Sequence, residues 1–463
     1  MLFRSVVSHF DPGEEREAKM QMMAIGARRF LFMRGDVIDI TDPLKPKMHN
    51  RKAFPGFQVN LAYNKKLGKW ILMTGAGIAG TFSTPKAPRG KYDDPSMIQQ
   101  NINQKGLRGV RFYDASDPGK LVLLSEWSCD QGDPKREVQT GSGTHRSFYD
   151  GGQYAYLDTA PDNSFIRMES SVRYYCNCVQ IIDVSDPSSP KFVANWWVPG
   201  QRIGEEAEYK KYRFAGDKIS WTGNHGALSV PKRVEDGGNV GYGGFGAFGM
   251  YVMDLTDITK PKPFGHVQWE FDAMGTIPFH TCYPVTADAA HPRLQNLIIG
   301  VPEALEADCR EIYHTPYVVD VKDPRNPKII GLFPRPAAPP DAPYNDFCMA
   351  RGRFGSHNTQ CWIAPGTAKA NLIAISWFNA GVRLFDISNP TAPKEVAWFV
   401  PPTSGEMNNY DSWWRGTTEN VFVEWDRNLI WIGTHEGSYC LTDRKSTRLN
   451  SSHVALSRMP SSA

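Results

Sequence analysis

The chain has 463 residues, of which 52 are Lys or Arg and 49 are Asp or Glu, so its net charge is +3. It contains 41 Gly and 34 Pro residues, a composition that suits short strands joined by many turns. No run of 18 apolar residues occurs, so no transmembrane segment is predicted. The first residues form neither a basic nor an apolar signal region, so no signal peptide is predicted.

Residues 443–463 differ from the rest of the chain. They show no apolar period, and they resemble the translation of a common DNA-sequencing adapter. We therefore predict a single folded domain over residues 1–442 and an unfolded tail over 443–463. The tail holds four basic residues and one acidic residue, which leaves 48 of each in the rest of the chain. A neutral domain argues against a nucleic-acid partner.

One sequence unit recurs six times along the chain. Each copy has an apolar, β-branched run that ends in Asp. After two more residues comes a second Asp or an Asn, usually followed by Pro. The run predicts a strand and the Asp-Pro pair predicts a tight turn into a second strand. The copies span residues 37–47, 110–120, 179–191, 250–262, 317–328 and 382–394.

The spacing of these units predicts the architecture. The Asp residues that end the apolar runs lie 66 to 75 residues apart, which leaves room for two more strands upstream in each unit. Four antiparallel strands repeated around an axis form an all-β propeller. A seventh unit begins at residues 419–425 and 429–433, but the Asp-Pro signature does not follow near Leu441. We therefore expect seven blades, with the last blade truncated by one or two strands and the ring not closed normally.

The repeated motif resembles the LVIVD-repeat family of bacterial β-propellers, over roughly residues 1–442. The resemblance implies the propeller fold, and it implies an exported, periplasmic or cell-surface location. It does not define an activity, because propellers host many unrelated functions.

Long connections gather on one face of the expected propeller. They join the second strand to the third within a blade, or the last strand to the next blade, and both kinds leave the sheet at the same end. Examples are residues 75–109, 303–316 and 334–356. Long loops on a rigid scaffold are where function concentrates, so we expect the site on this face, which we call the mouth.

Histidine recurs at one position of the repeat, at the expected start of the innermost strand. These histidines precede the repeat Asp by 29 to 40 residues, and unit two has Gln58 and unit seven has Glu419 at the same position. Innermost strands converge on the axis, so these side chains are expected to surround the mouth of the channel. The histidines are His9, His145, His225, His280 and His357.

Two interpretations of this ring are open. Three or four imidazoles with the Glu419 carboxylate could bind a transition metal such as Cu, Zn or Fe. A looser similarity to selenium-binding protein and methanethiol oxidase, propellers with axial histidines and a copper requirement, points the same way. Alternatively, the histidines bond neighbouring strand ends and seal the channel.

The predicted function is binding of an unidentified small molecule or protein at the mouth, and the oligomeric state is left open. The alternative is a metal-dependent enzyme, an oxidoreductase or a hydrolase, that uses the axial histidines. No catalytic residue is assigned.

Other signals are given ordinary explanations. The Gly-rich run at residues 75–80 spells a dinucleotide fingerprint, but Pro85 and Pro88 follow instead of a helix, so no such cofactor is predicted. The acidic residues at 303, 306, 308 and 311 predict the solvated face of a short loop helix. The eight cysteines lack metal-type spacing and are interpreted as small apolar fillers.

Overall fold

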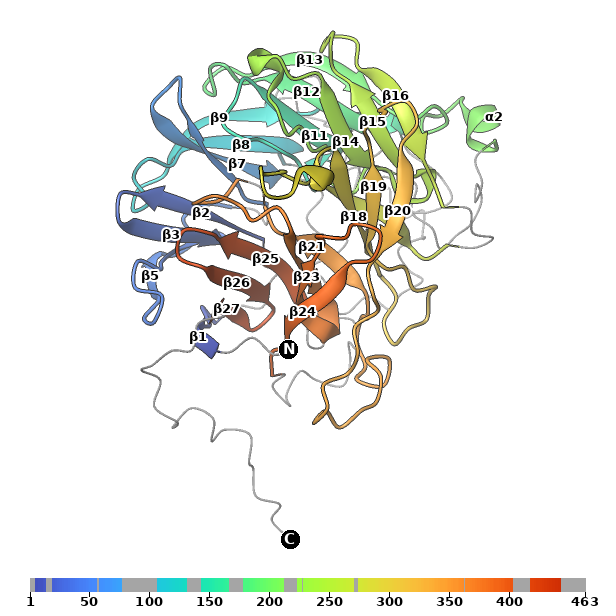
Figure 1. Cartoon of the computed structure of the whole chain (residues 1–463). Helices are drawn as coiled ribbons and strands as arrows, with labels where there is room; N and C mark the ends of the chain where they lie inside the picture. The colour runs from blue at the N-terminus through green and yellow to red at the C-terminus, as the bar shows by residue number, and fades with distance from the viewer. Residues whose placement is uncertain are drawn as a thin grey trace.

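Seven β-sheets arranged around a common centre make up the computed structural model of the chain (Figure 1). The structure describes residues 5–13, 19–55, 58–76, 106–130, 143–165, 178–211, 223–226, 228–269, 274–361, 363–402 and 417–442. The prediction of an all-β, seven-bladed propeller is confirmed.

Each blade is an antiparallel sheet, and in blades one to six its strands follow one another in the chain from the innermost to the outermost. Blades one and two consist of β2 (Met20–Ile25), β3 (Arg28–Met33), β4 (Asp36–Asp39) and β5 (Lys47–Asn50), and of β6 (Asn60–Asn64), β7 (Lys69–Ala76), β8 (Gly109–Asp114) and β9 (Val122–Ser128). Blade three consists of β10 (Gly143–Thr144), β11 (Tyr154–Ala160), β12 (Cys178–Asp183) and β13 (Lys191–Trp196). Blade four has β14 (Val240–Gly244), β15 (Met250–Asp254) and β16 (Lys262–Val267) as its second to fourth strands, and the segment that bridges to β14 through Ser229 and Tyr242 takes the innermost place.

The remaining blades follow the same plan. Blades five and six consist of β17 (Ile277–Pro284), β18 (Leu297–Glu303), β19 (Tyr317–Asp320) and β20 (Lys328–Leu332), and of β21 (Ser356–Thr359), β22 (Leu372–Trp377), β23 (Gly381–Asp386) and β24 (Lys394–Phe399). Blade seven consists of β25 (Thr418–Glu424), β26 (Leu429–Thr434), β27 (Gly437–Thr442) and β1 (Ser5–Phe10). Short helical turns lie in the connections: η1 (Asn163–Phe165), α2 (Glu206–Tyr209), η3 (Val234–Asp236), η4 (Gly246–Phe248), η5 (Pro292–Leu294) and η6 (Phe378–Ala380).

The Asp of each repeat unit closes the third strand of its blade, as the sequence predicts. Asp39 ends β4, and its carboxylate accepts a hydrogen bond from the backbone N–H of Thr41 at 2.9 Å. The next acidic residue, Asp42, accepts from Leu44 N in the same way at 3.0 Å. These two bonds fix the turn between the third and fourth strands. The corresponding pair recurs in the other five units.

The fourth strand of every blade carries a β-bulge at the same place, followed by a small or short polar residue. In blades one, two, four, five and seven, that residue faces the Asp-Pro turn of the next blade. The hydroxyls of Ser8 and Ser125 donate to the carbonyls of Pro43 and Pro187, both at 2.6 Å. At Gly331 a Cβ atom would collide with the carbonyl of Pro390. The repeat signature therefore also serves as the contact between neighbouring blades.

The expectation of a truncated seventh blade is wrong. β27 occupies the third position although no Asp-Pro turn follows it, and β1 from the start of the chain pairs antiparallel with it from Ser5–Thr442 to Phe10–Ser438. β1 has the bulge of the other outer strands and the same contact to the next blade through Ser8. Because the outer strand comes from the other end of the chain, the ring closes without a seventh signature turn.

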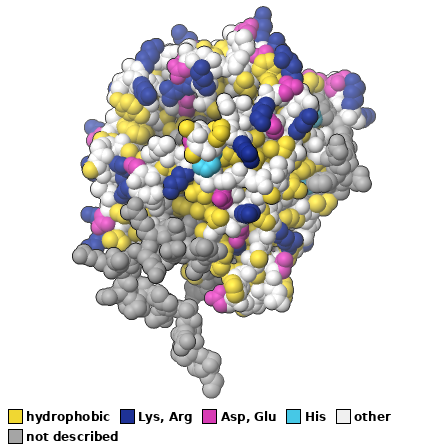
Figure 2. Space-filling view, viewed as in Figure 1, with side chains coloured by type: hydrophobic (Ala, Val, Ile, Leu, Met, Phe, Trp, Pro, Cys, Tyr) yellow, Lys and Arg dark blue, Asp and Glu magenta, His cyan; other side chains and the backbone are white. Residues whose placement is uncertain are grey.

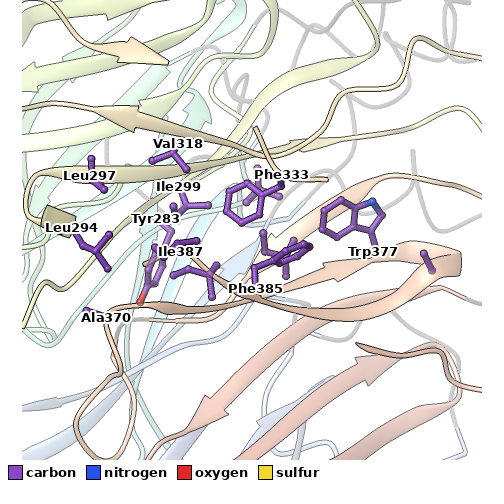
Figure 3. Close-up of a cluster of buried hydrophobic side chains, with 14 of the residues drawn as sticks. Tyr283, Leu294, Leu297, Ile299, Val318, Phe333, Ala370, Trp377, Phe385 and Ile387 are labelled. Atoms are coloured by element: carbon purple, nitrogen blue, oxygen red, sulfur yellow. The ribbon is translucent and has the colours of Figure 1, made fainter. Parts of the chain in front are cut away.

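Apolar cores fill the spaces between adjacent blades. Figure 3 shows the largest, in which Ile299 and Val318 of blade five face Trp377 and Phe385 of blade six. On the face drawn in Figure 2, basic and acidic side chains are interspersed, in keeping with the balanced charge. The predicted tail (443–463) and most of the glycine-rich run lie outside the described residues.

Candidate metal centre at the propeller axis

Four of the five predicted histidines meet at the axis. His145 follows β10, His225 lies on the innermost segment of blade four, His280 on β17 and His357 on β21. Their rings form a continuous series, with centroids 4.6 Å apart for His145–His225, 4.8 Å for His225–His280 and 5.3 Å for His280–His357. Glu419 on β25 lies beside the last of them. We call these residues the axial ring.

His9 does not belong to the axial ring. It lies on β1, the outermost strand of blade seven, where it stacks on Tyr439 at 4.1 Å and its Nε2 lies 2.8 Å from the carbonyl oxygen of Glu436. The expectation that His9 begins an innermost strand is therefore wrong, because the first strand of the chain closes the last blade instead.

Glu303 brings a carboxylate into the ring. It is the last residue of β18 and only 6% exposed, so its assignment to a solvated loop helix is wrong. Its Oε2 lies 3.4 Å from Nε2 of His225 and 3.3 Å from Nε2 of His280. Together His225, His280 and Glu303 form a buried group that could hold a metal ion. We call them the metal group.

The two contacts of Glu303 Oε2 match the ligand spacing of a coordination shell. Metal–ligand bonds of 2.0–2.1 Å give a tetrahedron whose edges are about 3.3–3.4 Å. The two contacts of Glu303 Oε2 fall in that range, and His145 Nε2 lies 3.1 Å from His225 Nε2. In the part of the chain that the structure describes, neither His280 Nε2 nor Glu303 Oε2 has a hydrogen-bond partner, although both atoms are buried. A cation between these lone pairs would satisfy both.

The protonation state of the histidines suits this role. Burial, with added repulsion from neighbouring histidines and Arg146, lowers the pKa of His145, His225 and His280 well below the ordinary value. The three imidazoles are therefore neutral at pH 7. Neutral imidazole is the form that binds a metal ion.

The other side of the axial ring is held by ion pairs. Arg353 donates through Nη1 to Glu303 Oε1 at 3.2 Å and through Nη2 to Glu419 Oε1 at 2.9 Å, and its guanidinium lies 3.6 Å from the centre of the Phe378 ring. His435 lies 3.3 Å from the same oxygen of Glu419. Burial alone would raise the pKa of Glu419, but His357 and Arg353 outweigh it and hold that pKa well below the usual range. We call Arg353, His357, Glu419 and His435 the ion-paired group.

The tautomer of His357 follows from its neighbours. Arg146 Nη2 lies 2.8 Å from His357 Nε2, and an arginine can only donate. His357 Nε2 therefore accepts, so Nδ1 carries the proton, donates to the backbone carbonyl of Glu419 at 2.9 Å and lies 2.8 Å from Glu419 Oε2. Both nitrogens of His357 are thus engaged with protein groups, unlike Nε2 of His280.

Sequence reasoning missed Glu303, Arg353, Arg146 and His435. Two of them adjoin residues that it found, since Arg146 follows His145 and Arg353 precedes His357 by four residues. Glu303 ends a strong apolar strand, a signal that could have placed it at a sheet end instead of in a loop helix.

A disulfide joins two long connections of the mouth, between Cys309 in the β18–β19 connection and Cys348 in the β20–β21 connection. The interpretation of these two cysteines as apolar fillers is wrong. Next to the disulfide, Asp308 N donates to Gly352 O at 2.8 Å. The disulfide therefore ties together the segments that lead from Glu303 and into Arg353.

Comparison with known proteins adds the repeat type. Residues 176–197 and 373–399 match the LVIVD repeat, and both segments cover the third and fourth strands of a blade. The chain is a β-propeller that carries the LVIVD repeat.

No curated protein matches the sequence of this LVIVD-repeat propeller. The similar solved structures include U3-55K, with 8% identity and a TM-score of 0.44 over 93% of this chain and 99% of that one. Raptor of Chaetomium thermophilum has 10% identity and a TM-score of 0.48 over 97% of this chain and 29% of its own. The propeller domain of Cps50 (Swd1) from Myceliophteria thermophila has 9% identity and a TM-score of 0.46, over 95% and 99%. These likenesses are too distant to bear on function. Among the described residues, no helix is long and apolar enough to cross a membrane.

Proposed function

We propose that this LVIVD-repeat propeller binds a divalent transition metal at its axis and uses the metal to bind or transform a ligand at the mouth. His225, His280 and Glu303 hold the ion, and His145 lies beside His225, with its Nε2 3.1 Å from that of His225. Two histidines with one carboxylate are a donor set of catalytic zinc sites and of non-haem iron sites, and imidazole also suits copper. When bound, such an ion polarises a ligand or lowers the pKa of coordinated water.

One observation carries the proposal. Glu303 Oε2 lies 3.4 Å from Nε2 of His225 and 3.3 Å from Nε2 of His280, and the ligand atoms of these three buried residues all lie within 4.8 Å of one another. The alternative in which the histidines only seal the channel accounts for His357, whose nitrogens both have protein partners. It does not account for Nε2 of His280 and Oε2 of Glu303, which are buried and have no hydrogen-bond partner in the described part of the chain.

Metal analysis of the purified protein tests the proposal. We expect about one equivalent of Zn, Cu or Fe in the protein and a large loss in His225→Ala and His280→Ala. His291→Ala is the matched control, because His291 lies in η5's N-terminal cap and contacts Asp288, away from the axis. Equally negligible metal in all four proteins, after incubation with each ion, would contradict the proposal. The identity of the retained metal separates a zinc-type hydrolytic site from a copper or iron oxidoreductase site.

We also propose that the protein works in an oxidising compartment, such as the periplasm or the cell surface. The disulfide between Cys309 and Cys348 supports this, since such bonds persist mainly outside the cytosol. Alkylation of thiols in intact cells, followed by mass spectrometry, should find both cysteines protected. Full alkylation of Cys309 and Cys348 before any reduction would contradict an oxidising location.

A further inference from the structure

The metal group has a basic neighbour. Arg146 is only 4% exposed, and its Nη2 lies 2.8 Å from Nε2 of His357. The same His357 nitrogen lies 3.5 Å from Glu303 Oε1. The Arg146 guanidinium and the Glu303 carboxylate of the metal group therefore both lie next to the same nitrogen of His357.

Buried charges of both signs lie at the axis before a metal binds. In the described part of the ring, Arg353 pairs with the carboxylates of Glu303 and Glu419, Arg146 lies beside His357, and the buried carboxylate of Asp158 accepts from the backbone N–H groups of His145 and Arg146. A divalent ion adds two positive charges to these three carboxylates and two guanidiniums, which leaves the cluster with a net positive charge. Uncompensated charge is costly in a buried site, so the loaded site favours an anion.

Gln58 offers a second donor beside Arg146. Its side chain is fully buried, and in the described part of the chain its Nε2 has no hydrogen-bond partner. Its Oε1 lies 3.4 Å from the backbone N of Ser147, the residue after Arg146. Gly75 leaves the space that Gln58 fills, because a Cβ there would stand 2.7 Å from Gln58 Cδ. A buried amide donor without an acceptor has an energetic reason to bind one.

We propose that the metal-loaded site binds a small oxyanion, such as a carboxylate or a phosphate, with one oxygen on the open metal position and another accepting from Arg146 and Gln58. This inference rests on the proposed metal site and names the ligand class for it. A guanidinium matches two oxygens of a carboxylate or phosphate in one plane, which favours an oxyanion over a halide.

The test uses the full chain loaded with cobalt(II), whose visible absorption reports its coordination shell. Acetate, inorganic phosphate and chloride are titrated separately at constant ionic strength into the wild type, Arg146→Met and Gln58→Met. Arg233→Met is the control, because Arg233 pairs with Asp150 in the turn before β11, at the end of blade three opposite the mouth. Cobalt content and thermal unfolding are measured for every sample, so that loss of the fold or of the metal is seen separately.

We expect a saturable spectral change with acetate or phosphate, and an affinity for that anion at least tenfold weaker in Arg146→Met and severalfold weaker in Gln58→Met. Arg233→Met should match the wild type. A cobalt-loaded protein that responds to none of the anions, or responds to chloride as strongly as to the oxyanions, would overturn this inference and leave the metal site standing. Unchanged oxyanion affinity in folded, loaded Arg146→Met or Gln58→Met would do the same. Failure of the wild type to take up cobalt or any other metal would overturn both proposals.

Discussion

The metal group and the ion-paired group use the same residue type at the same position of the repeat, yet their partners differ. His280 has Thr281 at Nδ1, and its Nε2 faces the carboxylate of Glu303. His357 has an arginine at Nε2 and a carboxylate at Nδ1. The comparison teaches that the position in the repeat places a histidine at the axis. The residues that the neighbouring blades contribute determine whether its nitrogen is available to bind a metal ion.

The largest expected effect is on stability, from Arg353→Met. This change leaves the buried carboxylates of Glu303 and Glu419 without their shared cation. Breaking a buried pair in this way costs about 3–5 kcal/mol. Urea unfolding of the metal-free protein should show this loss, with Arg335→Met as the control, because Arg335 forms an exposed pair with Asp346. Equal unfolding free energies for the two variants would show that the ion-paired group does not hold the axis together.

Loss of the disulfide should come next. The bond closes a separation of 39 residues, for which chain entropy predicts a stabilisation of about 2–4 kcal/mol. The double variant Cys309→Ser, Cys348→Ser should lower the unfolding free energy by that order and weaken metal binding severalfold, because Glu303 and Arg353 lie on the segments that it joins. The control is Cys361→Ser, since Cys361 is a free thiol elsewhere in the fold. Metal affinity equal to that of the wild type would separate the disulfide from the metal group.

A paired substitution sharpens the comparison directly. His280→Gln should lower metal affinity by roughly 100-fold, whereas His357→Gln should lower it by about tenfold or less, the scale of an outer-shell partner. The measurement is competition with a chromophoric chelator, made on proteins whose fold is checked by circular dichroism. The reverse ranking would assign the metal to the His357 side of the ring.

The smallest effect, counted for each histidine, is the pH dependence of the metal-free protein. The folded pKa values of His145, His225 and His280 lie well below the ordinary value of 6.5, so below that pH the unfolded chain binds protons that the folded chain does not. Stability should therefore fall from pH 7 to pH 5, by up to about 1.4 kcal/mol per pH unit for each histidine. Unfolding midpoints of the wild type and His280→Gln check this, and the variant should show the shallower fall. Parallel curves would contradict a neutral, buried His280.

The fold was more accessible from the sequence than the site was. The Asp residues of the six signatures end the third strands, because the turn chemistry that they carry is local. The position within the repeat also located five residues at the axis, because residues at the same position of each blade lie at the same distance from the axis. These residues are His145, His225, His280, His357 and Glu419. Glu303 and Arg353 lie at the edges of irregular connections, where no repeat phase applies. His9 was misplaced because the pairing of the first strand with the last strand leaves no signal in the local sequence.

The pairing of β1 with β27 has a consequence for how the molecule is made. His9 and Glu436 are in contact although 427 positions separate them along the chain. During synthesis, the first strand has no partner until the ribosome has released nearly all of the seventh blade. Closure of the ring is then a late folding event, and it carries the entropic cost of closing a very long loop. Earlier intermediates present an unpaired strand edge, which favours association between nascent chains.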